Sequence, residues 1–317
     1  MPVDNKSSTS SSRWLGVLMD KRILVVVDPR SDAQTAVERA AWLAAKVSAG
    51  LELFICDFDP DIDAGRSSTI WIEQPVREHL IEKLREKLDA LAAPLRARDL
   101  KVSIDVSWDH PLHDGIVRKV RDSQPWLVAK DTHHHGVLKR TILTNTDWHL
   151  IRDCPAPLLL VKPNTVPENP KVFAAVDPLH VHDKPARLDN ELLKVAGTLA
   201  ADVGGELHVV HAYMVPVELM VPDASQINAV VKKTRQSHKD AFAEFLEPHA
   251  IPDACAHLIE SPVDEALPGV TEKEGAWVIV MGAISRGGLE RVFIGSTAER
   301  VLDRLPCDVL IVKPERP

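Results

Sequence analysis

Continuous apolar runs alternate with amphipathic stretches along the chain. The first run, Ile23 to Val27, is apolar at every position, which is typical of a parallel strand buried on both faces. Residues 32 to 48 follow with apolar side chains at helical spacing, and Gly50 ends that helix. Because strand and helix signals keep alternating, the pattern predicts an α/β fold of parallel strands joined by right-handed helical crossovers.

Both halves of the chain show this order of elements. In the first half we predict strands at 23–27, 51–56, 102–106, 126–129 and 157–162, and helices at 32–48, 73–98, 113–121 and 148–152. In the second half we predict strands at 172–176, 206–212, 256–260, 277–281 and 309–313, and helices at 224–246, 263–272 and 298–305. Each half is therefore expected to be a five-stranded, parallel, Rossmann-like layer.

The two halves are copies of one another. The run that ends in Asp28-Pro29 recurs as a run ending in Asp177-Pro178, and Leu158 to Pro163 recurs at Val309 to Pro314. The spacing between equivalent positions stays near 150 residues, so the whole domain is duplicated. We assign domain 1 to residues 19–163, a proline-containing linker to 164–170 and domain 2 to 171–317. The serine-rich residues 1–18 are expected to form a disordered tail, and Met19 is a candidate initiator.

Composition narrows the classes of partner. A net charge of −8, with 45% hydrophobic and 26% charged residues, is ordinary for a globular protein and argues against nucleic acid or an anionic membrane surface as a partner. No apolar run has the length of a membrane span or a signal peptide. Four separated cysteines beside apolar runs fit buried thiols in a reducing cytoplasm.

A glycine-bearing loop near the C-terminus carries the strongest chemical signal. The strand before it ends in Gly282, and Gly295-Ser296 opens an amphipathic helix whose first N–H groups lack intrahelical partners. Such a helix start can hold an anion. A nucleophilic role for Ser296 is not favoured, since no neighbouring base motif accompanies it and serine at a helix start is usually a cap.

Domain 1 contains the same loop frame without its glycines. Aligned on the strand ends, Asp131 takes the place of Gly282, His134 that of Ser285, Thr144 that of Gly295 and Asn145 that of Ser296. A carboxylate at the position of Asp131 would repel a phosphate in a partly buried crevice. Phosphate binding is therefore expected only in domain 2.

The loop identifies a family by resemblance. From Lys21 to Pro314 the chain resembles the universal stress proteins, whose motif G-x2-G-x9-G-[S/T] reads here as Gly282-x2-Ser285-x9-Gly295-Ser296. The tandem arrangement resembles the E-type members of proteobacteria. The resemblance implies two adenine-nucleotide alpha hydrolase-like domains that form an internal pseudo-dimer through their last strands. It also implies a cytoplasmic, non-enzymatic role in survival of starvation, oxidation or DNA damage.

The resemblance also implies a nucleotide site, with ATP and Mg as the candidate ligand. In relatives that bind nucleotide, an aspartate contacts adenine and the glycine loop holds ribose and phosphates; by position these are Asp177, Gly282, Gly295 and Ser296, whereas domain 1 offers only Asp28. Ser285 departs from the motif, and a Cβ there costs about 1 kcal/mol if the backbone needs φ > 0. Arg286 and the glycines Gly287 and Gly288 can compensate. One alternative interpretation of the loop is a tight strand-to-helix turn without a ligand. If the loop does bind ATP, the alternative function is a nucleotide-binding sensor or a slow ATPase.

Two further features stay open. His110 and His113, with His133 or His135 from the next loop, could supply a zinc site, although solvated loop histidines are favoured. The apolar segment from Met214 to Val221 could bind a lipid or another small molecule, or it could cover the sheet edge. The sequence leaves open whether the pseudo-dimer pairs again as a homodimer.

Overall fold

The computed structural model describes residues 21–31, 33–63, 73–135, 140–179, 188–215, 224–283 and 296–314. Domain 1 contains β1 (Arg22–Val26), α1 (Thr35–Val47), β2 (Gly50–Asp57), α2 (Pro60–Asp63), α3 (Glu73–Arg96), β3 (Val102–Trp108), α4 (Leu112–Ser123), β4 (Leu127–Asp131), β5 (His133–His135), β6 (Arg140–Ile142), α5 (Asn145–Asp153) and β7 (Leu158–Val161). Domain 2 contains β8 (Lys171–Ala175), α6 (Leu188–Val203), β9 (Glu206–Tyr213), α7 (Ala224–Leu246), β10 (Ala256–Glu260), α8 (Val263–Glu274), β11 (Ala276–Gly282), α9 (Ser296–Arg304) and β12 (Asp308–Val312), with 3₁₀ turns η1 (Glu247–His249) and η2 (Asp253–Cys255) before β10.

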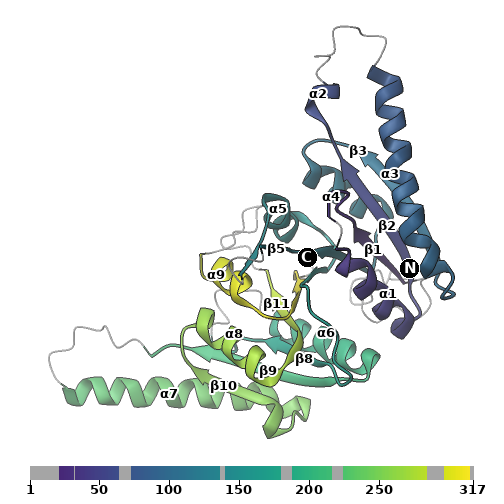
Figure 1. The fold of residues 1–317 in the computed structure, drawn as a ribbon. Coiled ribbons are helices and arrows are strands. Elements are labelled where there is room, and N and C mark those ends of the chain that lie inside the picture. The colour runs from purple at the N-terminus through teal and green to yellow at the C-terminus, as the bar shows by residue number, and fades with distance from the viewer. Residues whose placement is uncertain are drawn as a thin grey trace, which may run out of the picture.

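The two domains share one sheet (Figure 1). Its strand order is β10-β9-β8-β11-β12-β7-β4-β1-β2-β3, so each domain supplies five neighbouring strands. Within each domain the neighbours are parallel, whereas β12 and β7 are antiparallel, with Leu310 opposite Leu159. The expected pairing of the two last strands is therefore confirmed, and it makes the sheet continuous and mixed.

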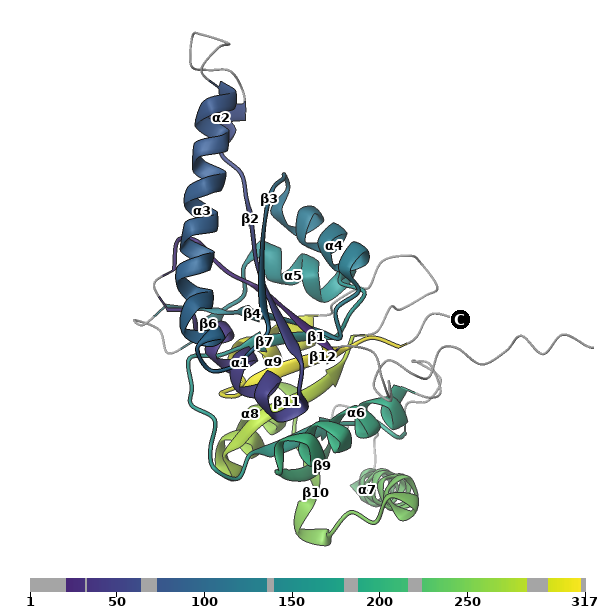
Figure 2. The ribbon, with the colours of Figure 1, turned by 90° about the vertical axis from the view of Figure 1, so that its right-hand side faces the viewer.

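Helices cover both faces of this sheet (Figure 2). Buried side chains of α1, α3, α6 and α7 pack on one face, and those of α4, α5, α8 and α9 pack on the other. The strands are apolar nearly throughout because both of their faces are buried. The hydrophobic core under α1, α3, α6 and α7 continues across the domain boundary. There the ring of Trp42 in α1 lies edge to face against that of Trp277 in β11, with centroids 4.9 Å apart.

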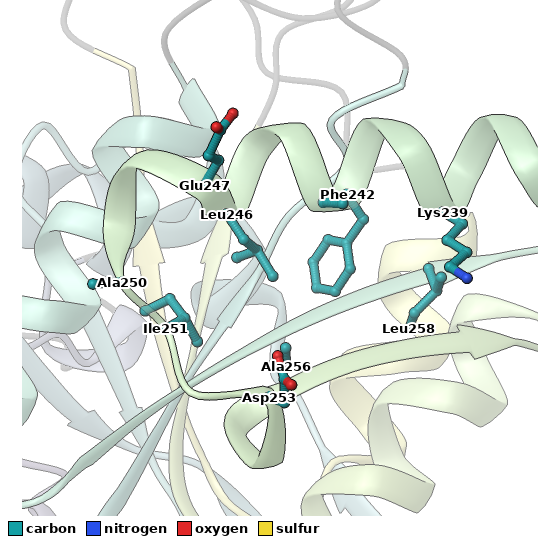
Figure 3. Close-up of a pocket in the computed structure, with 10 residues that line it drawn as sticks. Lys239, Phe242, Leu246, Glu247, Ala250, Ile251, Asp253, Ala256 and Leu258 are labelled. Atoms are coloured by element: carbon teal, nitrogen blue, oxygen red, sulfur yellow. The ribbon is translucent and has the colours of Figure 1, made fainter.

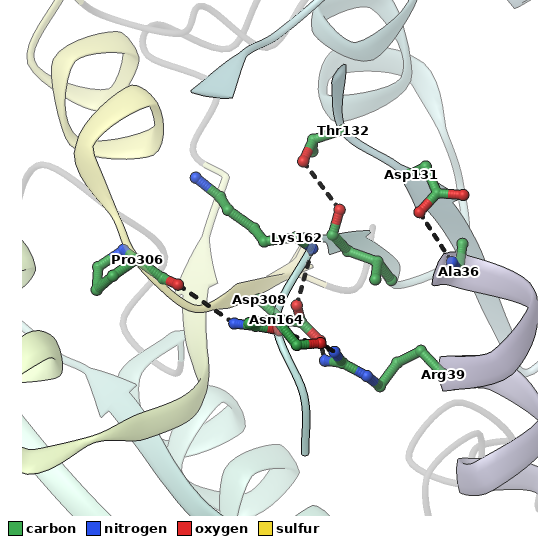
Figure 4. A network of polar contacts seen from close by, with 9 residues as sticks. Ala36, Arg39, Asp131, Thr132, Lys162, Asn164, Pro306 and Asp308 are labelled. Atoms are coloured by element: carbon green, nitrogen blue, oxygen red, sulfur yellow. Dashed lines mark hydrogen bonds and ion pairs between the residues drawn. The ribbon is translucent and has the colours of Figure 1, made fainter. Parts of the chain in front are cut away.

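Polar contacts reinforce the domain boundary (Figure 4). Arg39 of α1 pairs with the fully buried Asp308 of β12, and Asp308 Oδ1 accepts the backbone N–H of Lys162 at 2.9 Å. The Arg39 guanidinium also donates to Asn164 Oδ1 at 2.8 Å. Burial lowers the pKa of Arg39 to about 10, and the guanidinium still remains charged at neutral pH.

Two lysines cap helices of the opposite domain. Lys162, which follows β7, donates its Nζ to the carbonyls of Leu302 and Leu305 at 3.0 and 2.7 Å, at the end of α9. Lys313, which follows β12, donates to Arg152 and Cys154 at 2.7 and 2.6 Å, at the end of α5. A cation at a helix C-terminus satisfies open carbonyls and complements the helix dipole. The duplication therefore places an equivalent cap on each side of the boundary.

Some boundaries differ from those that the sequence predicts. His133–His135, expected to lie in a loop, forms the short strand β5 against β6, whose β-branched Thr141 and Ile142 favour extended backbone. Helix α5 begins at Asn145, earlier than predicted, because Thr144 and Asp147 form a capping box there. Of the four cysteines, Cys255 is only half-buried, whereas the other three are buried as expected.

Candidate nucleotide crevice

The carboxyl ends of the parallel strands in domain 2 bring together several residues that the sequence singled out. Asp177 lies two residues beyond the end of β8, His211 lies near the end of β9, and Gly282 is the last residue of β11. Strands β9, β8 and β11 are neighbours in that order, so the three residues lie side by side at the carboxyl ends of the strands. In open α/β sheets, ligands bind beside such carboxyl ends.

Asp177 is held by its neighbours while its carboxylate remains accessible. The Asp177 N–H donates to Oδ1 of Asp189, near the start of α6, at 3.3 Å. The Asp177 side chain is 46% exposed, and its Oδ1 lies 3.8 Å from Nδ1 of His211. A fixed backbone and an accessible carboxylate suit a residue that accepts hydrogen bonds from a ligand.

A buried pair of histidines lies beneath Asp177. His211 Nδ1 lies 3.1 Å from the carbonyl of Val176, and His211 Nε2 lies 2.9 Å from Nδ1 of His238 on α7. A carbonyl can only accept, so in the neutral ring Nδ1 of His211 carries the proton and Nε2 accepts from His238. This chain of hydrogen bonds fixes the tautomer of His211 and links α7 to the end of β8.

Tyr213 covers the histidine pair. Its ring stacks on that of His238 with centroids 4.2 Å apart, and its hydroxyl donates to Glu260 at 3.3 Å. Arg235 of α7 pairs with the same Glu260 at 2.7 and 2.8 Å. Burial raises the pKa of the Tyr213 hydroxyl, so the phenol stays protonated. His238 was missed in the sequence, although it lies one helical turn before buried Phe242 on the same face of α7.

Gly282 has a packing role of its own. A Cβ added at Gly282 would lie 2.9 Å from Cδ2 of Leu188, the first residue of α6. Leu188 is buried, so its side chain occupies the space that a larger residue at Gly282 would need. The glycine is therefore explained by close helix–strand packing, as the ligand-free interpretation of the loop requires.

The remaining candidates of this loop lie outside the described residues. These are Ser285, Arg286, Gly287 and Gly295, and of Ser296 only the backbone at the start of α9 is described. Most of the apolar segment from Met214 to Val221 also lies outside; Met214 is 60% exposed and Val215 is buried.

In domain 1, the strand end that corresponds to Gly282 carries a carboxylate, which lies at the start of α1. Asp131 ends β4, and its Oδ1 accepts the N–H of Ala36 in the first turn of α1 at 2.8 Å (Figure 4). Burial raises the pKa of the Asp131 carboxyl to about 6, while Lys130 and Arg39 oppose that rise. A helix N-terminus favours a negative charge, and here the protein supplies that charge itself.

A second carboxylate closes the start of α5. Asp147 is fully buried, its Oδ2 accepts the N–H of Thr144 at 2.7 Å, and its Oδ1 lies 2.8 Å from Nζ of Lys130. The Thr144 hydroxyl in turn accepts the N–H of Asp147 at 3.2 Å. By position, the counterparts of Lys130 and Asp147 in domain 2 are the uncharged Met281 and Ala298. A carboxylate of the protein thus accepts a backbone N–H at each of the two helix starts in domain 1.

The histidines proposed for a zinc site in domain 1 have separate neighbours. The His110 ring lies 4.6 Å from that of Phe58, and the His113 ring stacks on that of His149 at 3.6 Å. His133 and His135 lie on β5, where only the backbone is described. No three His, Cys, Asp or Glu side chains among the described residues are grouped as metal ligands.

Comparison with known proteins agrees with this architecture. The model of the universal stress protein family matches residues 19–162 and 176–313. The chain belongs to this family, and it is a tandem universal stress response protein. No helix in the described part of the chain has the length and apolarity that crossing a bilayer requires.

The relatives include tandem proteins of similar length. Universal stress protein E of Salmonella typhi is 30% identical over 303 residues, which cover 94% of this chain and 95% of that protein. Universal stress protein E of Escherichia coli K12 is 29% identical with the same coverage. A solved structure of a Pseudomonas aeruginosa PAO1 protein, described as functionally unknown, has a TM-score of 0.72 and 27% identity, covering 96% of this chain and 95% of that one. A universal stress protein from Archaeoglobus fulgidus shares the fold, with a TM-score of 0.65 and 17% identity over 93% of this chain and 99% of that one.

Proposed function

We propose that the domain 2 crevice binds an adenine nucleotide, with ATP and Mg as the candidate ligand. The position of Asp177 carries this proposal. Its backbone N–H is held by Asp189, while its side chain is 46% exposed at the carboxyl ends of the strands. Its carboxylate would accept a hydrogen bond from the adenine amino group. The buried His211–His238 pair would hold the wall beside the base.

The phosphate part of the proposed site follows the family motif. Gly282, Ser285, Arg286, Gly287, Gly295 and Ser296 are the residues we assign to ribose and phosphates. The start of α9 would supply backbone N–H groups and Arg286 a charge-assisted contact. Domain 1 would not contribute a second phosphate site, since the carboxylates of Asp131 and Asp147 lie at its helix starts and would repel a phosphate.

We further propose that the protein acts in the cytoplasm by binding rather than by catalysis, in survival of starvation, oxidation or DNA damage. In this proposal domain 1 serves as the permanent partner of domain 2. The antiparallel β7–β12 pair and the lysines that cap helices across the boundary support that division of roles. Pairing of two such chains as a homodimer would be an additional step.

Calorimetric titration of the full chain with ATP and Mg²⁺ tests the nucleotide site. We expect one site per chain, and Asp177→Asn should weaken it by about tenfold, because an amide presents a donor where the base needs an acceptor. Asp28→Asn, at the equivalent position of domain 1, is the matched control and should leave the affinity unchanged. Absence of heat at high nucleotide concentration, or equal losses in both variants, would contradict the proposal.

A second candidate function is a carrier of a lipid or another apolar small molecule. The 60% exposure of Met214 favours it, since a large apolar side chain at the start of a loop is available to a ligand. Native mass spectrometry of the freshly purified chain separates the two candidates. A bound mass that matches a nucleotide supports the first, and a bound lipid that is lost in Met214→Ser supports the second.

A further inference from the structure

An open cavity lies between the C-terminal part of α7 and the edge strand β10 (Figure 3). Its volume is about 520 Å³, and Phe242, Leu246, Ile251, Ala256 and Leu258 line it together with Lys239. Pockets for small organic ligands have volumes in this range. The cavity lies towards the amino end of β10, whereas the nucleotide crevice lies at the carboxyl ends of the strands.

Domain 1 provides an internal reference for this cavity. After the long helix of each domain, one residue adopts a left-handed conformation, Asp99 with φ 60° and Ala250 with φ 49°. The burial pattern of the two helices matches Leu88 and Ala92 of α3 to His238 and Phe242 of α7, so α7 has one more residue before its left-handed residue than α3 has.

The strands can be matched in the same way. Ile104 of β3 lies opposite Leu53, and Ala256 of β10 lies opposite Val209. Leu53 and Val209 are themselves equivalent, because they pair with Val25 of β1 and Ala174 of β8, which are equivalent positions of the duplicated first strand. Ile104 and Ala256 therefore occupy the same place in their domains.

In domain 1 this space is filled. Leu88, Ala92 and Leu95 are each 0% exposed, and Ile104 packs against the same core. In domain 2, His238 and Phe242 are likewise buried, and beside them Leu246 is half-buried while Lys239 and Ala243 are exposed. An alanine in place of Ile104 removes a large apolar group from the strand, and the cavity lies against this alanine, Ala256.

The walls and the rim of the cavity differ in character. Phe242, Leu246 and Ile251 point into the space between α7 and β10, while Glu247 points away from it (Figure 3). Lys239 lies beside Leu258 at one end, and no hydrogen bond or ion pair occupies its ammonium group within the described part of the chain. Asp253 and Glu247 are the other charged residues that line the cavity.

We propose that this cavity is a second binding site, for a small organic anion with an apolar or aromatic body. The body would pack between Phe242, Leu246 and Leu258 and leave water, which supplies most of the affinity. The anionic group would pair with Lys239 and so orient the molecule, and the carboxylate of Asp253 disfavours the reverse orientation. This site is distinct from the proposed nucleotide site, because it lies towards the other end of the sheet, although α7 contributes residues to both.

Titration of the full chain with 1-anilinonaphthalene-8-sulfonate, an aromatic sulfonate, tests the proposal by fluorescence and calorimetry. We expect one saturable site that excess ATP and Mg²⁺ do not displace. Ala256→Ile, which restores the residue of domain 1, and Ala243→Leu, on the exposed side of the cavity, should each reduce the affinity by at least about tenfold by filling the space. Because Ala243 is exposed, that variant keeps the test valid even if Ala256→Ile fails to fold.

Reversal of charge tests the orienting contact. Lys239→Glu should weaken binding of the sulfonate by about fivefold or more, since an attraction becomes a repulsion. Lys233→Glu changes an exposed lysine of the same helix that does not line the cavity, and it should have no effect. The proposal is overturned by lack of saturable binding, by displacement with ATP, by unchanged affinity in both filling variants, or by equal effects of the two charge reversals.

Discussion

The crevices of the two domains show how one fold can keep its architecture while its chemistry changes. In domain 2, Gly282 ends the fourth strand without a side chain, and the equivalent of the Lys130–Asp147 pair is the uncharged Met281 and Ala298. In domain 1, Asp131 accepts an N–H of α1, and Asp147 accepts an N–H at the start of α5. Domain 1 thus places a carboxylate of its own at each of these two helix starts.

The comparison also separates structural glycines from functional ones. Gly282 is close-packed against Leu188, so its retention in domain 2 does not by itself indicate a phosphate. In domain 1 the Asp131 side chain instead reaches the first turn of α1, where it accepts the N–H of Ala36.

The largest effect is expected from removing one member of the buried ion pair of domain 1. Asp147→Ala should destabilise the protein by about 3–5 kcal/mol, because Lys130 would be left buried without its carboxylate. Urea unfolding followed by circular dichroism measures the loss.

The double variant Lys130→Met with Asp147→Ala is the matched control, since it gives domain 1 the residues of domain 2. It should be close to wild type or more stable, because no uncompensated charge remains. A double variant as unstable as Asp147→Ala alone would show that the charge pair is not the cause.

A smaller effect is expected at Asp131, and it should depend on pH. Burial raises the pKa of this carboxyl from 3.8 to about 6, so the folded state binds the proton more tightly than the unfolded state. Stability from this group is therefore present at low pH and is lost as the pH rises through about 6. Asp131→Asn keeps the acceptor for Ala36 and removes the charge, so it should stabilise the protein at pH 7.5 by about 2 kcal/mol.

The measurement is the difference in unfolding free energy between Asp131→Asn and wild type at pH 7.5 and pH 4.5. The difference should shrink at the lower pH, where the wild-type carboxyl is protonated in the folded state. A difference that is equal at both values of pH would refute the assigned cause.

A comparable or smaller effect is expected where domain 2 keeps its glycine. Gly282→Ala places a Cβ 2.9 Å from Leu188 Cδ2 and should cost about 1–2 kcal/mol, because the leucine must shift within a packed core. In a Leu188→Ala background the same change should cost less, since the obstructing methyl group is gone. Equal costs in the two backgrounds, measured by thermal unfolding, would argue that Gly282 is retained for another reason.

The sequence predicted the sheet well because its strands are apolar on both faces and the duplication aligns them. The β7–β12 pair followed from the family resemblance, and the runs around Leu159 and Leu310 are long enough to mark those strands without ambiguity. The expected position of Asp131 was also informative, since a carboxylate at a strand end is visible in an alignment of the two halves.

The contacts between distant elements could not be predicted in this way. His238 pairs with His211 across 27 positions of the chain, and Lys162 caps a helix that begins 134 residues later. Such contacts depend on how far a helix is displaced along its strand, which periodicity does not report. The packing of Leu188 on Gly282 could not be predicted for the same reason.

The smallest effect concerns the cap of α5 and sharpens the contrast with Gly295, its counterpart in domain 2. Thr144→Ala should destabilise by about 1 kcal/mol, because the hydroxyl that accepts the N–H of Asp147 is lost. Thr144→Gly should cost less than Thr144→Ala, since glycine is tolerated at a helix N-cap, where its backbone is readily solvated. If thermal unfolding shows glycine to be the worse of the two, the threonine acts mainly by restricting the backbone, and a glycine at position 295 would then need a ligand or a neighbour to hold the start of α9.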